Sequence, residues 1–236
     1  MKTLPHDAAL PNRTQRRKAR TAQAIIEAAE QQFLEHGYAP TTLEAIAEAA
    51  DVAVGSIYFH FAGKDDLYLA VMERAVAQLD AYETAALAPE LTPRERLIAL
   101  GDAYLRFALD HPRAFRLMAF AQEDMSGVAG PAAERRARID AQVEMLIARL
   151  TGIVSQMVGV GQTPAIDAPR AARFLWGAWN GVIALHLFSH TPVEGEIAAV
   201  LAEGRRLLTA GFDALVGGAT PNTSPSADGE ESVFRG

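Results

Sequence analysis

The sequence predicts an all-α protein of about nine helices, with a three-helix head at the N-terminus and a larger helical body behind it. Apolar residues recur at helical spacing almost throughout, and strand-like alternation bounded by turns does not occur. Ala, Leu, Glu and Arg, which favour helices, are abundant. Half of the 236 residues are hydrophobic, which is enough to build the core of one large domain or two modest ones.

Composition narrows the class of protein before any motif is considered. The chain has no cysteine, which excludes a disulfide framework and thiolate metal sites and is typical of a reducing cytosol. The N-terminus lacks the apolar stretch of a signal peptide, and no run of about 18 apolar residues could span a bilayer. We therefore expect a soluble cytoplasmic protein with no membrane partner.

The charge is distributed unevenly along the chain. The formal net charge is −7, yet residues 1–20 carry six basic side chains and a single acidic one. A basic end on an acidic body is expected when only one part of a protein meets a polyanion. The alternative is a solvated basic arm with no partner.

Residues 1–15 are expected to form a flexible basic arm, and a first helix is predicted from about Arg16 to His36. Its apolar stripe has helical spacing, and Gly37 supplies a C-terminal stop. The stripe consists of Ala24, Ile25, Ala28, Ala29 and Phe33. Such a stripe is typical of a helix that packs with one face on a core.

Two short helices are predicted next, at about 43–50 and 54–60, separated by the tight break 51–53. Thr41 and Glu44 have capping-box spacing, which predicts a helix start. Two short helices joined by such a break, with a supporting helix before them, form a helix-turn-helix candidate over residues 16–63. The alternative is a helical hairpin with no role in DNA binding.

The body is predicted over residues 64–216, followed by a disordered Gly/Pro/Ser-rich tail at 217–236. Capping-box spacing at Thr92–Glu95 and Thr191–Glu194 predicts two helix starts. The six predicted helices lie at about 64–88, 93–111, 112–122, 132–158, 169–190 and 194–216.

Within the helix-turn-helix, some positions serve packing and others face outward. Ala47 is small where the two short helices must approach closely, and Val52 and Ile57 would fill the gap between them. The exposed side of the second short helix would carry short side chains that let its backbone enter a major groove. Hydroxyl and imidazole groups beside it could donate hydrogen bonds to phosphate oxygens.

The stretch 58–67, YFHFAGKDDL, preceded by TTLEAIA at 41–47, resembles the TetR-type transcriptional regulators. The resemblance covers about residues 17–70. It implies a homodimer that places two recognition helices in successive major grooves of a pseudo-palindromic DNA operator.

The resemblance also implies roles for individual residues of the head. Phosphate contacts would come from Thr42, Tyr58, His60 and Lys64. Base-edge contacts would come from Gly55, Ser56 and Phe59, with Ala53 and Val54 near thymine methyl groups. Arg17 and Lys18 in the basic segment would contact the backbone. Glu44 departs from members with a basic residue there, so no base contact is transferred to it.

The predicted helix 169–190 has a flat side and a bulky side. Gly177, Gly181, Ala184 and Phe188 fall within about 60° of one another on a helical projection. We expect this side to form a dimer interface together with the last helix, through Leu208 and Phe212. The alternative is that the glycines meet another helix of the same chain.

The interior of the body is expected to hold an apolar or aromatic small-molecule effector, because aromatic and methionine side chains suit such a ligand. The candidates are Tyr104, Phe107, Phe115, Met118, Phe120, Met145, Trp176, Trp179, Asn180 and His186. The alternative is that these residues are ordinary core.

No further chemistry is predicted. His186 and His190 have a spacing that could bind a metal, but two histidines do not complete a site. Neither a catalytic grouping nor a phosphate-binding loop is present in the sequence, so we expect neither enzyme activity nor a cofactor.

The sequence therefore predicts a homodimeric, ligand-responsive repressor. Effector binding would swing helix 64–88, which carries the head, and weaken DNA binding. A transcriptional activator or architectural DNA-binding protein with the same head is the first alternative. A helical small-molecule carrier or enzyme is the second.

Overall fold

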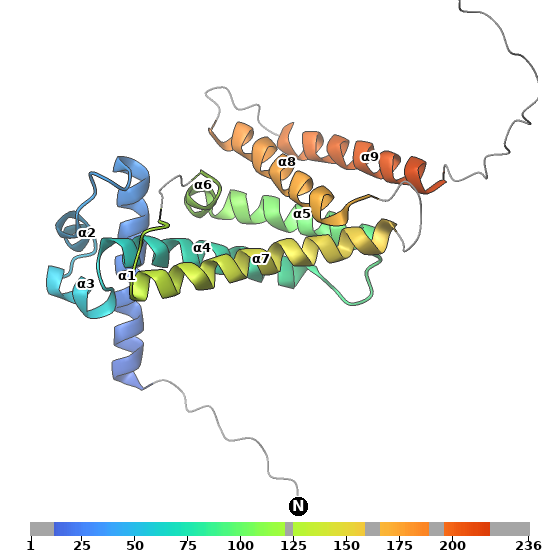
Figure 1. The fold of residues 1–236 in the computed structure, drawn as a ribbon. Coiled ribbons are helices and arrows are strands. Elements are labelled where there is room, and N and C mark those ends of the chain that lie inside the picture. The colour runs from blue at the N-terminus through green and yellow to red at the C-terminus, as the bar shows by residue number, and fades with distance from the viewer. Residues whose placement is uncertain (1–11, 121–124, 159–165, 189–195, 218–236) are drawn as a thin grey trace, which may run out of the picture.

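The computed structural model describes residues 12–120, 125–158, 166–188 and 196–217, and in these segments it contains nine helices and no strand (Figure 1). This confirms the all-α prediction. The helices are α1 Arg13–His36, α2 Leu43–Ala49, α3 Val54–His60, α4 Lys64–Ala86, α5 Pro93–Asp110, α6 Pro112–Phe120, α7 Pro131–Val158, α8 Ala168–Phe188 and α9 Glu196–Gly217.

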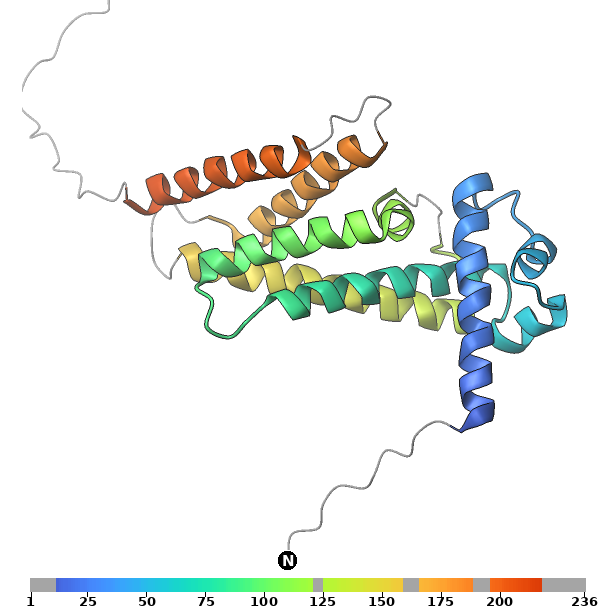
Figure 2. The same cartoon turned by 180° about the vertical axis from the view of Figure 1, so that it is seen from behind.

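The head and the body meet along α1 and α4. Helices α1, α2 and α3 form the head, and α1 crosses one end of the long helices α4 and α7 (Figures 1 and 2). Helix α4 packs on α1, α5, α6 and α7, so it is the central element of the molecule. Helices α8 and α9 lie together on one side of the body, with α8 against α5 and α7.

Capping groups explain where the helices begin. Helix α1 starts earlier than predicted because of a capping box that was not recognised in the sequence. The Asn12 side chain accepts a hydrogen bond from the Gln15 backbone N–H, and the Gln15 side chain accepts one from the Asn12 backbone N–H. The N-cap of α2 is Thr42 and not Thr41, whose hydroxyl instead donates to the carbonyl oxygen of Gly37 at 2.7 Å. The capping box at Thr92 is present as predicted.

One continuous core runs from the head into the body. Ile25 and Ile57 of the head and Leu67 of α4 are fully buried in the same cluster as Phe107 and Phe115 of the body. Burial of each such side chain contributes about 1.5–3 kcal/mol. The head is therefore fastened to α4 by packing.

No described helix combines the length and the apolar character that crossing a bilayer requires. The predicted capping box at 191–194 and residues 218–236 of the predicted tail lie outside the described residues, and Gly217, predicted as the start of the tail, is the last residue of α9.

Candidate nucleic-acid interface

The turn between α2 and α3 fixes the orientation of α3. The Val52 N–H donates to the Ala47 carbonyl oxygen at 3.0 Å, and Asp51 adopts a left-handed backbone with φ 52° that reverses the chain. Ala47 and Ile57 are buried between the helices, and Val52 is packed against them. The predicted packing role of these three residues is confirmed.

Helix α3 presents large side chains to solvent. Tyr58 and Phe59 are 59% and 69% exposed, and the Phe59 ring meets the His60 ring edge to face with centroids 5.1 Å apart. Gly55 is also exposed, and a Cβ added to it would meet nothing within 4 Å. Ser56 and His60 are half-buried beside them. A short helix that exposes two aromatic rings has a face suited to a partner.

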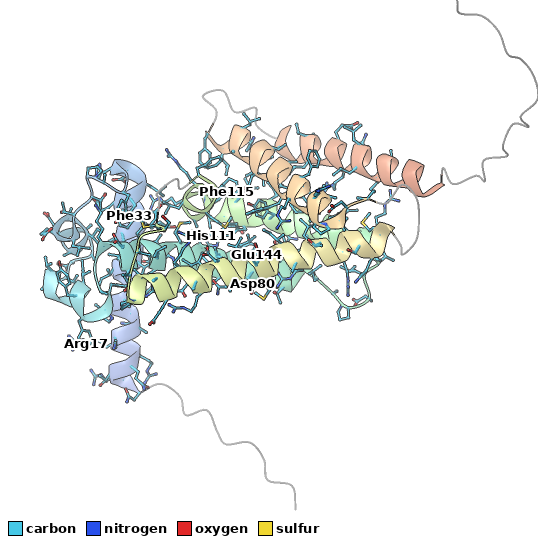
Figure 3. The ribbon with its side chains drawn as sticks, in the orientation of Figure 1. Arg17, Phe33, Asp80, His111, Phe115 and Glu144 are labelled. Carbon is cyan, nitrogen blue, oxygen red and sulfur yellow. The ribbon has the colours of Figure 1, made fainter. Side chains whose placement is uncertain are left out.

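The first turns of α1 flank this exposed face. An open hollow separates the two helices; α1 contributes Arg17 and Lys18 to its wall, and α3 contributes Gly55, Ser56 and Phe59. The Lys18 ammonium lies 4.7 Å from the centre of the Phe59 ring. Figure 3 shows Arg17 on the free end of α1, away from the body. The positive charges predicted from the sequence therefore adjoin the exposed face of α3.

His60 closes the hollow at the end of α3. Burial lowers the pKa of its imidazole, and the neighbouring Lys18 charge lowers it further. The ring is therefore neutral at physiological pH and can donate from one nitrogen only.

The remaining predicted residues lie at the edges of α3. Ala53 is its exposed N-cap, and Val54 is half-buried against the core. The Thr42 hydroxyl accepts a hydrogen bond from the Ala45 N–H at 3.1 Å, which leaves its own proton available to donate.

Lys64 makes contacts that the sequence did not reveal. Its ammonium donates to the Ala39 carbonyl oxygen at 2.9 Å and lies 4.4 Å from the centre of the Tyr38 ring. The Tyr38 hydroxyl in turn donates to Asp65. The ammonium at the N-terminus of α4 is thus held by the loop between α1 and α2.

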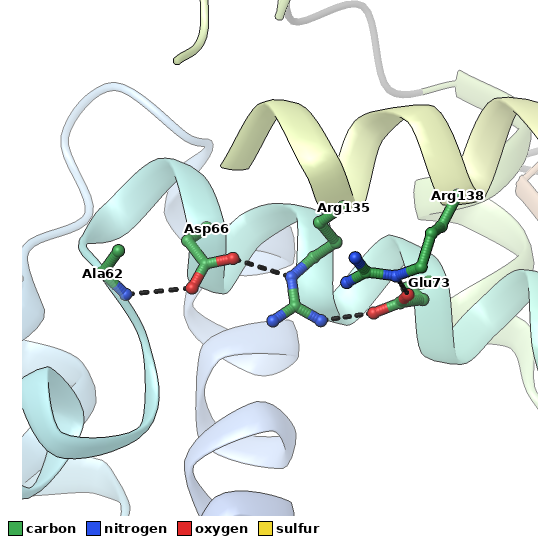
Figure 4. Close-up of polar contacts among 5 residues, drawn as sticks. All are labelled: Ala62, Asp66, Glu73, Arg135 and Arg138. Carbon is green, nitrogen blue, oxygen red and sulfur yellow. Dashed lines mark hydrogen bonds and ion pairs between the residues drawn. The ribbon is translucent and has the colours of Figure 1, made fainter. Parts of the chain in front are cut away.

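A chain of charged groups links the end of α3 to the body (Figure 4). The buried carboxylate of Asp66 accepts from the Ala62 N–H at 2.9 Å and from the Arg135 guanidinium of α7 at 2.8 Å. Arg135 also pairs with Glu73, which accepts from Arg138 at 2.8 Å. The sequence reading missed this network, because only the fold brings the first turn of α4 to the first turns of α7.

The body contains an apolar cavity of about 90 Å³ between α4, α5, α6, α7 and α8. Of the predicted effector residues, Met118, Trp176 and Trp179 line it. Phe107, Phe115 and Tyr104 are instead buried in the core, where the Tyr104 hydroxyl donates to the Asn180 side chain at 2.6 Å.

The other predicted effector residues lie away from this cavity. Phe120 and Met145 are 45% and 47% exposed, and His186 is half-buried outside the cavity wall. His190 lies outside the described residues. Among the residues that are described, no group of three potential ligands could hold a metal ion.

The sequence reading missed the carboxylate in the cavity wall, Glu83. It follows Met72, Val76 and Leu79 at intervals of four, three and four residues on α4, and all four line the cavity. The sequence contains a signal for this residue, because Glu83 is an acid at a position where the helical stripe of α4 predicts an apolar side chain.

The outer side of α8 and α9 is apolar and open. Phe174 and Leu185 of α8 and Leu207 of α9 are 68%, 74% and 69% exposed. A Cβ added at Gly177 or Gly181 would meet nothing within 4 Å, so these glycines do not pack on another described helix of the chain.

Of the other residues predicted for a dimer face, Ala184 is half-buried and Phe188 is 38% exposed and stacks on Phe115. Leu208 instead lines a hollow against α5, so its neighbour Leu207 is the residue that faces outward. The side chain of Phe212 lies outside the described residues.

Comparison with known proteins gives two family matches. Residues 25–71 match the family of bacterial regulatory proteins of the tetR type, and residues 97–208 match the tetracyclin repressor-like C-terminal domain. A tetR-family regulatory protein from Rhodococcus RHA1 has a similar structure, with a TM-score of 0.65 and 24% identity, over 79% of this chain and 94% of that one.

Two curated relatives match over part of the chain. The HTH-type transcriptional repressor BepR of Brucella suis is 48% identical over 63 residues, which are 27% of this chain and 30% of BepR. The HTH-type transcriptional activator FasR of Mycolicibacterium smegmatis is 34% identical over 102 residues, 43% of this chain and 46% of FasR. The matched regions thus span less than half the length of these two relatives.

Proposed function

The chain belongs to the TetR family of bacterial regulatory proteins, and on this premise we propose that it is a DNA-binding transcriptional regulator and not an enzyme. It acts in the cytoplasm as a homodimer on a palindromic operator, and a small molecule releases it. The observation that carries the proposal is the exposed face of α3 beside the basic first turns of α1.

Helix α3 enters the major groove. Gly55 and Ser56 allow close approach of the backbone to base edges, and Phe59 packs against them. Tyr58 and His60 donate to phosphate oxygens, as do Thr42 and Lys64 at the neighbouring helix starts. Arg17 and Lys18 contact the backbone across the hollow, where they contribute affinity without sequence preference.

Two copies associate through α8 and α9. The exposed side chains of Phe174, Leu185 and Leu207 supply the apolar area. The open glycines Gly177 and Gly181 let the backbones of two α8 helices approach closely. With a two-fold axis through this face, each contact would occur twice.

The effector acts through α4. One half of this helix lines the cavity through Met72, Leu79 and Glu83, and its first turn holds the head through Asp66. A ligand that favours one position of α4 over another therefore changes the position of α3. The resulting change in head separation breaks the match to two half-sites.

We propose repression as the regulatory outcome, as in the relative named a repressor. Activation is the second candidate, because FasR is named an activator and its match covers 43% of this chain, against 27% for BepR. Deletion of the coding sequence separates the two: expression of the target rises for a repressor and falls for an activator.

The first test is selection of genomic DNA fragments by the purified, ligand-free protein, followed by footprinting of the enriched fragments. We expect a protected site with approximate two-fold symmetry close to a promoter. The proposal is wrong if folded protein enriches no fragment above non-specific binding at moderate salt.

A further inference from the structure

Among the described residues that line the body cavity, one side chain is ionisable. Glu83 is 6% exposed. The other lining residues, for example Met72, Leu79 and Val143, are apolar or aromatic. A carboxylate in such surroundings loses most of its hydration and needs a partner of opposite charge or a proton.

Glu83 shares its nearest partner with a second acid. The Arg149 guanidinium donates to Glu83 at 2.7 Å and to Asp80 at 2.6 Å. One guanidinium therefore serves two carboxylates, and the cluster keeps a charge of −1 when both are ionised. Arg149 donates to the Oε2 atom of Glu83.

The surroundings make that charge costly. Burial raises the pKa of Glu83 to about 7, against the opposing effect of Arg149. The other titratable groups near it are Asp80 on its own helix and Tyr104 of α5. The cavity residues that α8 contributes carry no charge. Near neutral pH the site therefore takes up either a proton or a cation.

Two indoles complete the recognition surface. Trp176 and Trp179 of α8 line the same cavity as Glu83. The face of an indole attracts a cation, most strongly where water is excluded. The cavity thus combines a buried negative charge with aromatic walls, and these features select a positive, hydrophobic guest.

We propose that this cavity binds a hydrophobic monocation, a quaternary ammonium or an amine with an aromatic or branched apolar body, with its charge beside Glu83. The proposal deepens the function proposed above and depends on it for the regulatory consequence only. An anion would meet a cluster that is already negative. A neutral guest would leave Glu83 to be protonated.

The wild-type protein tests this with three matched compounds. Benzyltrimethylammonium is the cation, 2,2-dimethylpropylbenzene is its uncharged isostere, and 4-tert-butylbenzoate is an anion of similar shape. The chain has only two tryptophans, Trp176 and Trp179, so intrinsic fluorescence reports on the cavity directly. At pH 8, where Glu83 is mostly ionised, we expect the cation to bind at least about tenfold more tightly than the isostere, since its charge balances that of the carboxylate.

The pH dependence is a second readout. Benzyltrimethylammonium carries no titratable proton, so any change in its affinity belongs to the protein. A proton competes with it for a carboxylate of pKa about 7. We therefore expect its affinity to fall about tenfold from pH 8 to pH 6, while that of the isostere does not fall.

Glu83→Gln removes the charge and keeps the shape of the side chain. We expect this variant to lose the preference for the cation and its pH dependence while it still binds the isostere. Glu90→Gln, at an exposed position between α4 and α5, is the control and should behave as wild type. Circular dichroism checks the fold of both variants, and if Glu83→Gln does not fold, the wild-type series still decides.

Equal or tighter binding of the isostere or the anion to wild type overturns the proposal, and so does a cation affinity independent of pH. DNA binding is measured separately, with an operator fragment from the genomic selection. If the cation binds with the expected pH dependence but leaves operator affinity unchanged, the ligand class stands and the effector role falls.

Discussion

At the scale of single residues, the exposed rings of α3 distinguish this surface from the rest of the head. Tyr58 and Phe59 remain open to solvent, while Phe33 and Tyr68 pack edge to face inside. Exposure of this kind does not stabilise the fold, because apolar surface that stays in water contributes no hydrophobic free energy to folding. The side chains of Tyr58 and Phe59 are therefore suited to a surface that DNA covers.

Tyr58→Phe removes a hydroxyl and nothing else. We expect about fivefold weaker binding to operator and to unrelated DNA alike, since a lost hydrogen bond to phosphate costs about 1 kcal/mol without changing base preference. Fluorescence anisotropy with both DNAs measures this. Tyr82→Phe in the body loses a hydrogen bond to Asp110 and is the control; a selective loss on the operator alone would show that Tyr58 reads bases.

The sequence predicted the residues of the head, which form a local motif. It did not predict which residues line the body cavity, because that depends on the direction in which each side chain points from its helix. The head residues follow a contiguous motif, so the exposure of Gly55, Tyr58 and Phe59 on α3 could be expected. The cavity wall could not be chosen by residue type. Met145 is a plausible wall residue by chemistry, yet it is 47% exposed, while its neighbour Leu146 lines the cavity. One position on a helix is a turn of about 100°.

Two glycines on body helices should respond differently to the same substitution. A Cβ on Gly101 of α5 would come within 3.2 Å of the Trp179 ring, whereas one on Gly152 of α7 would meet nothing within 4 Å. We expect Gly152→Ala to stabilise the protein by about 0.5–1 kcal/mol through helix propensity. Gly101→Ala should forfeit that gain and shift the tryptophan emission.

Urea unfolding measures both variants, and the emission spectrum of the folded state reports the Trp179 ring. Equal stabilisation by the two substitutions, with an unchanged spectrum, would mean that the ring gives way freely.

At the scale of elements, the positions of the helices in the sequence were predictable, and the polar contacts that join one helix to another were not. The sequence marks its helices with caps and breakers, so the predicted and observed spans agree closely. The start of α1 differs because Asn12 and Gln15 were not recognised as a capping pair. The joint between α4 and α7 depends on Asp66 and Arg135, which are 69 positions apart, and no local pattern connects them.

Arg135→Gln tests that joint. It removes the cation between Asp66 and Glu73, and the buried Asp66 loses a charged partner. We expect a loss of about 2–3 kcal/mol in the free energy of unfolding. Arg136→Gln breaks an exposed ion pair with Asp140 on the same helix and should cost less than about 0.5 kcal/mol.

Chemical denaturation of the two variants at one pH makes the comparison. Similar losses for Arg135→Gln and Arg136→Gln would contradict a structural role for the network in Figure 4.

At the scale of the whole molecule, the apolar side of α8 and α9 is the surface that a single copy leaves exposed to solvent. Leu185 is 74% exposed on a helix whose other side is buried against α5 and α7. The proposed dimer would cover it, and the glycines of α8 would lie at the closest approach.

Leu185→Glu places a charge on that face. Since a two-fold interface contains each substitution twice, we expect dimerisation to weaken by about 3 kcal/mol or more. Analytical ultracentrifugation measures the mass. Leu109→Glu, at a 45% exposed position on α5, should leave the mass unchanged. Retention of a dimer in Leu185→Glu would place the interface on another face.

The length of α4 has a mechanical consequence. At about 1.5 Å per residue, its span from Lys64 to Ala86 is about 33 Å. If the helix pivots at its far end, a displacement of about 1 Å at Leu79 becomes about 3 Å at Lys64, by simple leverage. That is close to the rise of one base pair, about 3.4 Å. A small ligand in the body cavity would therefore shift the head by about one base-pair step along the DNA.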